Sequence, residues 1–447
     1  MHSKGRRLPP LLVVALIAVP LGAAIAGRDA YIALIVPTIA AVLGLLALCR
    51  ALDERGAGQA EDRRVLRWTV SAFAAHLLFG LVVTNTPSAV YYLGGDAGTY
   101  HTYARWIAEF GTRSIPGGLQ TGKEGFYYTL ATLYRVFGFH PASGLVLNAA
   151  LGAALVPVLT DATRRLFGRD AAHWVAPVVV LFPSMFLFTS QLLKEAPIVF
   201  LLAVALNAAV RIAERLTLGG VGVLTLSVAL LLTFRGPIAM VAGIALIGGI
   251  ALGRRQVLSG LVTGLIVVMV LAVVVIGIGV GHSGVQSALQ SSSLQDANRV
   301  RTGLAYDAGS GIGGNVDTST ARQALSYLPV GLARFALGPF PWEFRKPSQL
   351  PALIDVLVLW WLAPKAWRGF RTAARNHGRR LAVFLLPAIA TATVLSLSVG
   401  NLGVLVRERL QVLILVVPLL AYGISLRPGT GTEPAPEQVP GAPALVA

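Results

Sequence analysis

The sequence predicts an all-α, polytopic membrane protein with about 12 transmembrane helices. Of its 447 residues, 55% are hydrophobic and only 13% are charged, and the mean hydropathy is +0.70. A soluble domain of this size does not bury so large an apolar fraction. Apolar runs close to the length of about 20 residues that crosses a bilayer recur along the chain. The single cysteine, Cys49, excludes an internal disulfide framework and a cysteine-based metal cluster.

Apolar runs bounded by charged or turn-forming residues define each predicted spanning segment. In chain order these segments are 9–27, 30–49, 68–86, 142–160, 172–188, 196–210, 217–233, 237–252, 256–281, 350–364, 381–399 and 409–425. Two further apolar pieces, 126–138 and 325–341, are short or interrupted. We expect these two to be re-entrant or interfacial helices on the outer face.

The basic residues indicate which ends face the cytoplasm. The chain carries a net charge of +17, and most of its 37 basic residues fall in short loops on one side of the predicted spans. The positive-inside rule assigns this side to the cytoplasm and places both termini there. Because the charge follows the topology of the spans, it gives no support to a nucleic-acid partner.

The spans and loops group into five regions. The first residues could also be a cleaved signal peptide, but we expect an uncleaved helix, since only two charged residues separate the first two apolar runs. The regions are two N-terminal helices with a basic cytoplasmic loop (1–67), a transmembrane core with a candidate catalytic loop at 85–125 (68–281), a long outer loop with an interfacial helix (282–349), C-terminal helices (350–426) and a disordered cytoplasmic tail (427–447).

A polar stretch follows the third predicted span. It places Asp96 after two glycines and just before a helical pattern that begins near Thr99 and includes Tyr100 and His101. Glycine allows a tight turn and a close approach of backbone to ligand. We interpret Asp96 as a catalytic carboxylate at the head of an interfacial helix, with Tyr100 and His101 as substrate-binding residues. The alternative is a helix-capping aspartate in an ordinary loop.

Other charged residues collect on the same predicted face. Lys194 and Glu195 occupy a short outer turn, Arg235 occupies another, and Arg407 and Arg409 open the last helix. Glu195 is a candidate second acid or base, and the four cations are candidate phosphate ligands. Each of them could instead anchor a helix end. Residues two apart in a helix point to opposite sides, so Arg407 and Arg409 reach one ligand only if the backbone is irregular.

An aromatic segment at the end of the long outer loop gives the remaining candidates. Trp342, Glu343 and Arg345 are interpreted as contacts for a sugar ring or lipid headgroup, although tryptophan is also common in interfacial belts. Neither His76 nor His101 has the spacing of a metal ligand, so we expect hydrogen-bonded histidines and no metal site. Asp355, near the outer end of a span, is expected to pair with a cation.

A series of short motifs resembles a known superfamily. It begins with Asp96 and continues with Tyr100-His101-Thr102-Tyr103-Ala104, Lys123-Glu124-Gly125-Phe126-Tyr127-Tyr128, Leu133-Tyr134-Arg135-Val136-Phe137-Gly138, Asn148-Ala149-Ala150-Leu151-Gly152-Ala153, Leu181-Phe182-Pro183-Ser184 and Lys194-Glu195. This order is similar to the N-terminal half of GT-C glycosyltransferases, particularly bacterial protein mannosyltransferases and aminoarabinose transferases. The resemblance covers about residues 70–215.

The resemblance implies a function. In that superfamily the acid of the first outer loop is the catalytic base and the donor is a sugar on a polyprenyl phosphate. Carried over, Asp96 activates an acceptor hydroxyl, and Lys194, Arg235 and Arg407 stabilise the leaving phosphate. Two departures from the pattern are that two helices, rather than one, precede the acid, and that Ala97 replaces a second adjacent acid. A divalent cation stays open as a cofactor.

The resemblance therefore predicts a cell-envelope glycosyltransferase of the bacterial cytoplasmic membrane. Its active site would face outward, and its partners would be a polyprenyl-phosphate-linked sugar, a glycan, lipid or protein acceptor, and the bilayer. A polysaccharide polymerase or O-antigen-type ligase would use the same class of donor. A lipid-linked glycan flippase is a third alternative, which predicts charged residues in broken helices and an internal repeat. No repeat is visible in the sequence.

Overall fold

The computed structural model describes residues 31–52, 59–86, 96–111, 123–254, 293–306, 310–312, 316–344 and 349–426, with scattered residues between 262 and 289. In this part of the chain, fifteen α-helices and one short 3-10 helix, η4 (Pro341–Glu343), form the regular structure. An isolated antiparallel bridge joins Gly311 to Asn401. The predicted all-α fold class is confirmed.

The described residues contain fewer membrane-spanning helices than the predicted twelve. By length and composition, seven helices could cross a membrane: α2 (Tyr31–Leu52), α3 (Gln59–Asn85), α7 (Ala142–Phe167), α11 (Glu195–Glu214), α12 (Leu218–Gly253), α17 (Leu350–Asn376) and α18 (Gly378–Ser398). An eighth span results if Arg169–Leu181, which contains α8 (Arg169–Ala172) and α9 (Val175–Leu181), is joined to α10 (Pro183–Thr189), which is bent from it by 59°. The chain is thus a multi-pass membrane protein with seven or eight candidate spans in its described part.

Three reasons account for the difference in number. The predicted segments 217–233 and 237–252 both fall in α12, which counts as one candidate span. The predicted segment 9–27 and most of 256–281 lie outside the described residues. The predicted segment 409–425 is the larger part of α19 (Leu402–Ser425), which is not among the seven candidate spans and which carries Arg407, Glu408 and Arg409 in its first turns. The count of twelve is therefore not established.

The 36-residue helix α12 reverses direction within its length. The backbone of Arg235 is non-helical, with φ −161° and ψ 81°. A Cβ placed on Gly243 would lie 3.1 Å from Cγ1 of Val228, whereas these residues would be about 22 Å apart in a straight helix. α12 is therefore a hairpin of two antiparallel arms. This geometry agrees with the tight turn predicted at Arg235, between segments 217–233 and 237–252.

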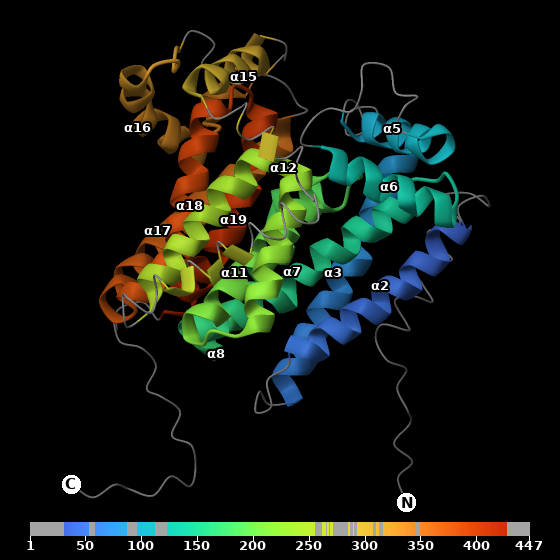
Figure 1. The fold of residues 1–447 in the computed structure, drawn as a ribbon, viewed down its shortest axis with the longest axis horizontal. Helices are drawn as coiled ribbons and strands as arrows, with labels where there is room; N and C mark the ends of the chain where they lie inside the picture. The colour runs from blue at the N-terminus through green and yellow to red at the C-terminus, as the bar shows by residue number, and fades with distance from the viewer. Residues whose placement is uncertain are drawn as a thin grey trace, which may run out of the picture.

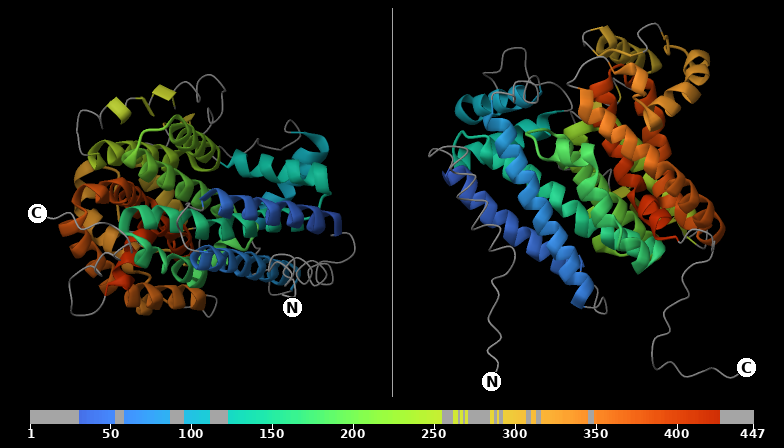
Figure 2. Two further views of the ribbon diagram at one scale, coloured as in Figure 1. Left: turned by 90° about the horizontal axis from the view of Figure 1, so that it is seen from below. Right: turned by 180° about the vertical axis from the view of Figure 1, so that it is seen from behind.

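The helices form one bundle whose two ends differ. α19 packs against α7, α11, α17 and α18, and most of its residues are buried. α5 (Asp96–Phe110), α15 (Leu294–Tyr306) and α16 (Ala321–Leu337) lie over one end of the bundle, here termed the α5 end, and α8 lies at the other, the α8 end (Figure 1). The right-hand view in Figure 2 shows the same separation from behind.

The two pieces predicted as re-entrant or interfacial fall largely on the helices α6 and α16. Segment 126–138 lies within and just beyond α6 (Glu124–Phe137), and segment 325–341 begins within α16 and ends at η4. α6 packs on α5, and α16 packs on α18. Neither helix is among the candidate spans.

α17 and α19 approach each other closely through glycines. A Cβ on Gly423 would overlap the carbonyl oxygen of Lys365, and one on Gly369 would lie 2.8 Å from the carbonyl oxygen of Leu419. Small residues of this kind let helix backbones come together where the lipid provides no hydrophobic driving force for association. The contact fixes the position of α19, and with it the arginines near its start.

Candidate active site at the α5 end

Two carboxylates and one arginine from distant parts of the chain meet at the α5 end. Arg407 of α19 donates a hydrogen bond of 2.6 Å to Oδ2 of Asp96, the first residue of α5. Its Nε lies 3.2 Å from Oε1 of Glu195, the first residue of α11. The side chain of Asp96 is 35% exposed, whereas that of Glu195 is 2% exposed. Arg407 therefore bridges an accessible carboxylate and a buried one.

A second ion pair lies beside the first. Arg235, at the tip of the α12 hairpin, pairs with Glu408, the residue after Arg407. Lys194, the N-cap residue of α11, is buried and interacts electrostatically with Arg235, Glu195 and Arg407. The four residues that we expected to converge, Asp96, Lys194, Arg235 and Arg407, are thus brought together.

The segment 190–194, which leads into Lys194 and Glu195, is held by Asn148 of α7. Its side-chain nitrogen donates to the carbonyl oxygens of Gln191, at 2.5 Å, and Leu193, at 2.8 Å. These carbonyls lie outside any helical ladder, so a buried side-chain donor satisfies them. Asn148 was noted in the sequence only as part of a motif, and its position on α7 gave no sign of this contact.

The same segment lies deeper in the bundle than the sequence suggested. Ser190 is fully buried, and its hydroxyl lies 2.8 Å from Nδ1 of His76 of α3. His76 precedes the end of α3 at Asn85 by nine residues, or about 13 Å along the helix axis. A Cβ on Gly80 would overlap the carbonyl oxygen of Ser190, so the two backbones are in direct contact. The predicted short outer turn is therefore a recessed, buried segment.

The first turns of α5 are fixed against α6. Tyr100 is buried, and its ring meets that of Phe126 edge-on with centroids 4.9 Å apart. Nδ1 of His101 lies 2.9 Å from the hydroxyl of Tyr134. His76 and His101 are both hydrogen-bonded, as expected. Tyr100 is too enclosed to present a large surface to a ligand, although its hydroxyl has no hydrogen-bond partner among the described residues.

The pKa values of Asp96 and Lys194 both lie below their usual values in this cluster. Burial by itself raises the pKa of the Asp96 carboxyl, but Arg407, with Lys123 and Lys194, brings it below its usual value. Burial lowers the pKa of Lys194 to about 7, and Arg235 acts in the same direction. At neutral pH, Asp96 is therefore ionised, and the ammonium of Lys194 gives up its proton more readily than that of an ordinary lysine.

Arg409 faces away from this cluster. Its Nε donates to the carbonyl oxygen of Phe335 at 2.7 Å, and another nitrogen donates to the carbonyl of Gly338. Asp355 lies 3.6 Å from Arg409 and accepts a hydrogen bond of 2.9 Å from the amide of Ser184. Arg409 thus caps the C-terminal end of α16 and pairs with Asp355, which has the pairing role that we expected for it.

The aromatic segment near η4 makes its side-chain contacts within itself and with α16. Trp342 is 76% exposed and stacks on Phe340 with ring centroids 4.9 Å apart. Glu343 accepts from the amide of Phe340 at 2.8 Å and pairs with Arg334 at 3.0 Å. Arg345 lies outside the described residues. The proposed sugar-contact role of these three residues remains a prediction.

No group of three histidine, cysteine, aspartate or glutamate side chains within the described ranges could hold a metal ion. Asp96 and Glu195 both direct oxygens at the guanidinium of Arg407. The residues grouped here therefore do not make a fitting site for a divalent cation, and no step is derived through one.

Comparisons with protein-family models, with curated proteins and with solved structures find no match to this chain. The site is therefore interpreted from its own chemistry.

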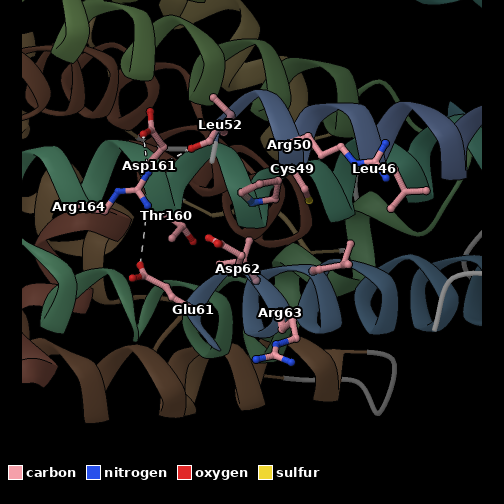
Figure 3. Close-up of a pocket in the computed structure, with 13 residues that line it drawn as sticks. Leu46, Cys49, Arg50, Leu52, Glu61, Asp62, Arg63, Thr160, Asp161 and Arg164 are labelled. Atoms are coloured by element: carbon pink, nitrogen blue, oxygen red, sulfur yellow. Dashed lines mark hydrogen bonds and ion pairs between the residues drawn. The ribbon is translucent and has the colours of Figure 1, made fainter. Parts of the chain in front are cut away.

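A second polar cluster lies at the α8 end. The carboxylate of Asp161, which is almost fully buried, lies 3.1 Å from Arg164, 3.3 Å from Arg165 and 2.7 Å from Arg211. Figure 3 shows Arg164 between Asp161 and Glu61 at the edge of a cavity of about 180 Å³. Because Asp161 of α7 pairs with Arg211 of α11, and Arg164 of α7 reaches Glu61 of α3, we interpret this cluster as a structural tie between these three helices.

Proposed function

We propose that this protein is a membrane glycosyltransferase that uses a polyprenyl-phosphate-linked sugar as donor. The single observation that supports this most directly is the Asp96–Arg407–Glu195 arrangement. A half-exposed carboxylate, able to take a proton, contacts an arginine that is itself held from behind by a buried carboxylate. Lys194 and Arg235 add positive charge beside it.

In the proposed reaction, Asp96 accepts the proton of an acceptor hydroxyl as the oxygen attacks the anomeric carbon. The bond between that carbon and the phosphate oxygen breaks, and polyprenyl phosphate leaves with the bonding electrons. Arg407, Arg235 and protonated Lys194 stabilise the phosphate charge. When a phosphate draws Arg407 towards itself, Asp96 loses a hydrogen bond to its charged form and becomes a stronger base.

Glu195 has a different role in this proposal. Because its carboxylate is buried, it positions Arg407 and does not reach the acceptor. Charge-assisted contacts of this kind hold a guanidinium in one orientation. Of the two predicted catalytic acids, Asp96 is therefore assigned proton transfer and Glu195 orientation.

The test is a transfer assay on the purified protein in lipid nanodiscs with a panel of radiolabelled polyprenyl-phosphate sugars. Asp96→Asn is expected to reduce transfer at least about 100-fold. Glu109→Gln is the matched control, because Glu109 is an exposed acid on the same helix that pairs with Arg105. Full transfer by Asp96→Asn would overturn the base assignment, and no transfer from any donor by the wild type would overturn the function.

Translocation of a lipid-linked glycan is a second candidate, favoured by one observation. The α9–α10 pair bends by 59° just before the buried segment that carries Lys194, and broken spans of this kind build transporter sites. Flipping of a fluorescent polyprenyl-phosphate sugar in proteoliposomes, retained in Asp96→Asn and without sugar transfer in the wild type, would establish this candidate instead.

We also propose that the α5 end faces the outside of the bacterial cytoplasmic membrane. The test uses single cysteines in a Cys49→Ser background. A membrane-impermeant maleimide is expected to label Glu109→Cys in intact cells and Arg371→Cys only after permeabilisation. The reverse pattern would overturn this orientation.

A further inference from the structure

A cavity of about 470 Å³ lies at the α8 end, between α2, α7, α11 and the start of α12. Its lining includes Arg215, the C-cap residue of α11, whereas Glu195 of the candidate active site begins that helix. The 20 residues of α11 separate the two positions by about 30 Å. The cavity is therefore distinct from the candidate active site.

One part of the cavity is cationic and preorganised. Arg165, Arg211 and Arg215 line it, against the single acid Glu214. Arg165 is fixed by Glu214 at 2.8 Å, and Arg211 by Asp161 at 2.7 Å. Arg215 is exposed and has no carboxylate partner among the described residues. An anionic group that binds here would therefore contact guanidinium groups, two of which are already held in place by carboxylates.

The N-terminus of α12 faces the same space. Thr217 caps the helix by accepting from the amide of Gly220 at 3.1 Å, and Thr217, Gly219 and Gly220 all line the cavity. A Cβ on Gly219 would meet nothing within 4 Å. First-turn amides point out of a helix without intrahelical acceptors, and they favour a phosphate together with the helix dipole.

Apart from Asn207, the rest of the lining is apolar. Leu48 and Leu52 of α2 lie on one side, and Val158, Val204 and Val223 of the other helices complete the wall. A free phosphate needs no such surface, whereas the glycerol backbone and first methylenes of a phospholipid would cover it. A volume of this size is within the range of known ligand sites.

We propose that this cavity binds an anionic phospholipid, with its phosphate at Arg215, Arg211 and the start of α12 and its acyl chains along Leu48 and Leu52. Basic pockets between membrane helices have the chemistry that recognises such headgroups. The site is independent of the proposed transfer reaction, and it would tie α2 to the α11–α12 pair.

The test measures lipid binding to the purified full chain. Native mass spectrometry is expected to show one retained phosphatidylglycerol in preference to phosphatidylcholine, and thermal unfolding in detergent is expected to shift upward with phosphatidylglycerol alone. Arg215→Gln and Gly219→Leu, which fills the open space at the helix start, should each reduce the retained lipid at least about threefold. Arg371→Gln is the matched control, because Arg371 is exposed on α17, outside the cavity lining.

Two results would overturn the proposal. The first is equal retention of phosphatidylglycerol by the wild type and both cavity variants. The second is a stabilisation by millimolar inorganic phosphate equal to that by the lipid, which would show a free-anion site. If both cavity variants unfold, binding of spin-labelled phosphatidylglycerol to the wild type is measured instead, with unlabelled phosphatidylglycerol or phosphatidylcholine as competitor. Equal displacement by the two lipids would then reject the site.

Discussion

Arg407 and Asp96 are separated by 311 residues in the chain, yet a guanidinium nitrogen and a carboxylate oxygen lie 2.6 Å apart. The contact joins α19, in the middle of the bundle, to α5, which lies over its end (Figure 1). Since Arg407 also contacts Glu195, one side chain relates three helices. Because Asp96 is the accessible member of these three residues, a substrate would contact the Asp96–Arg407 pair first.

Replacing Arg407 by lysine should reduce transfer more than it reduces stability. Lysine keeps the charge, but it has a single nitrogen and cannot contact Asp96 and Glu195 through two separate nitrogens of a planar group. We expect kcat/KM for a polyprenyl-phosphate sugar to fall by about 100-fold. Steady-state kinetics would check this, with Arg371→Lys as control; an unchanged kcat/KM in Arg407→Lys would remove Arg407 from the site.

Removing the charge of Arg407 should leave the buried carboxylate of Glu195 without the cation that it contacts at 3.2 Å. Arg407→Gln is therefore expected to destabilise the protein by about 3–5 kcal/mol, because breaking a buried pair on one side costs more than removing both partners. The double variant Arg407→Gln/Glu195→Gln should recover part of this loss. The free energy of unfolding in mixed micelles is measured for the wild type, the two single variants and the double variant. If the effects of the two single changes simply add up in the double variant, the two groups are not coupled.

The stability of the protein should rise with pH above neutrality because of Lys194. Burial lowers the pKa of Lys194 from 10.5 to about 7, so between these values the unfolded chain binds more protons than the folded one. The free energy of unfolding then increases with pH, by up to about 1.4 kcal/mol per unit. Lys194→Met should flatten this slope between pH 7 and 10 in denaturation experiments. Identical slopes in the two proteins would refute the assignment.

Asn148 should be needed for the geometry of the buried segment that follows α10. Asn148→Ala leaves the carbonyl of Leu193 without a donor, whereas that of Gln191 keeps the amide of Leu193 at 2.8 Å, so the change should cost about 1–3 kcal/mol. Transfer should fall as well, since this segment positions Lys194. The control is Asn85→Ala, whose side chain bonds only to its own helix; an equal loss in both variants would contradict the positioning role.

The close contact of α17 and α19 should not tolerate a methyl group. Gly423→Ala forces an overlap with the backbone of α17 and is expected to lower the melting temperature by several degrees. Gly44→Ala, in α2, meets nothing within 4 Å and should be neutral or slightly stabilising. If Gly423→Ala melts with the wild type, the backbones are further apart than described.

The sequence could predict the helices because their information is local. Apolar runs identified α7 and α11, and the pair Gly236-Pro237 identified the reversal at Arg235. The opposite directions of Arg407 and Arg409 also follow from the helical repeat alone. These features depend on neighbours within one or two turns.

The pairing of charges could not be predicted in this way. Arg235 and Glu408 are 173 residues apart, and nothing in either neighbourhood selects the other. Nor could the sequence show that Lys194 is buried, because burial depends on how distant helices pack around the segment that contains it. The number of spans was also uncertain, because α19 combines a spanning length with charged first turns.

The central position of α19 has a consequence for biosynthesis. Asp96 and Glu195 are translated long before Arg407, so both carboxylates are made before the cation that they share. A nascent chain that stops before α19 would expose this imbalance and should be a substrate for quality-control proteases. The network of Asp96, Glu195 and Arg407 can form only once α19 has been made.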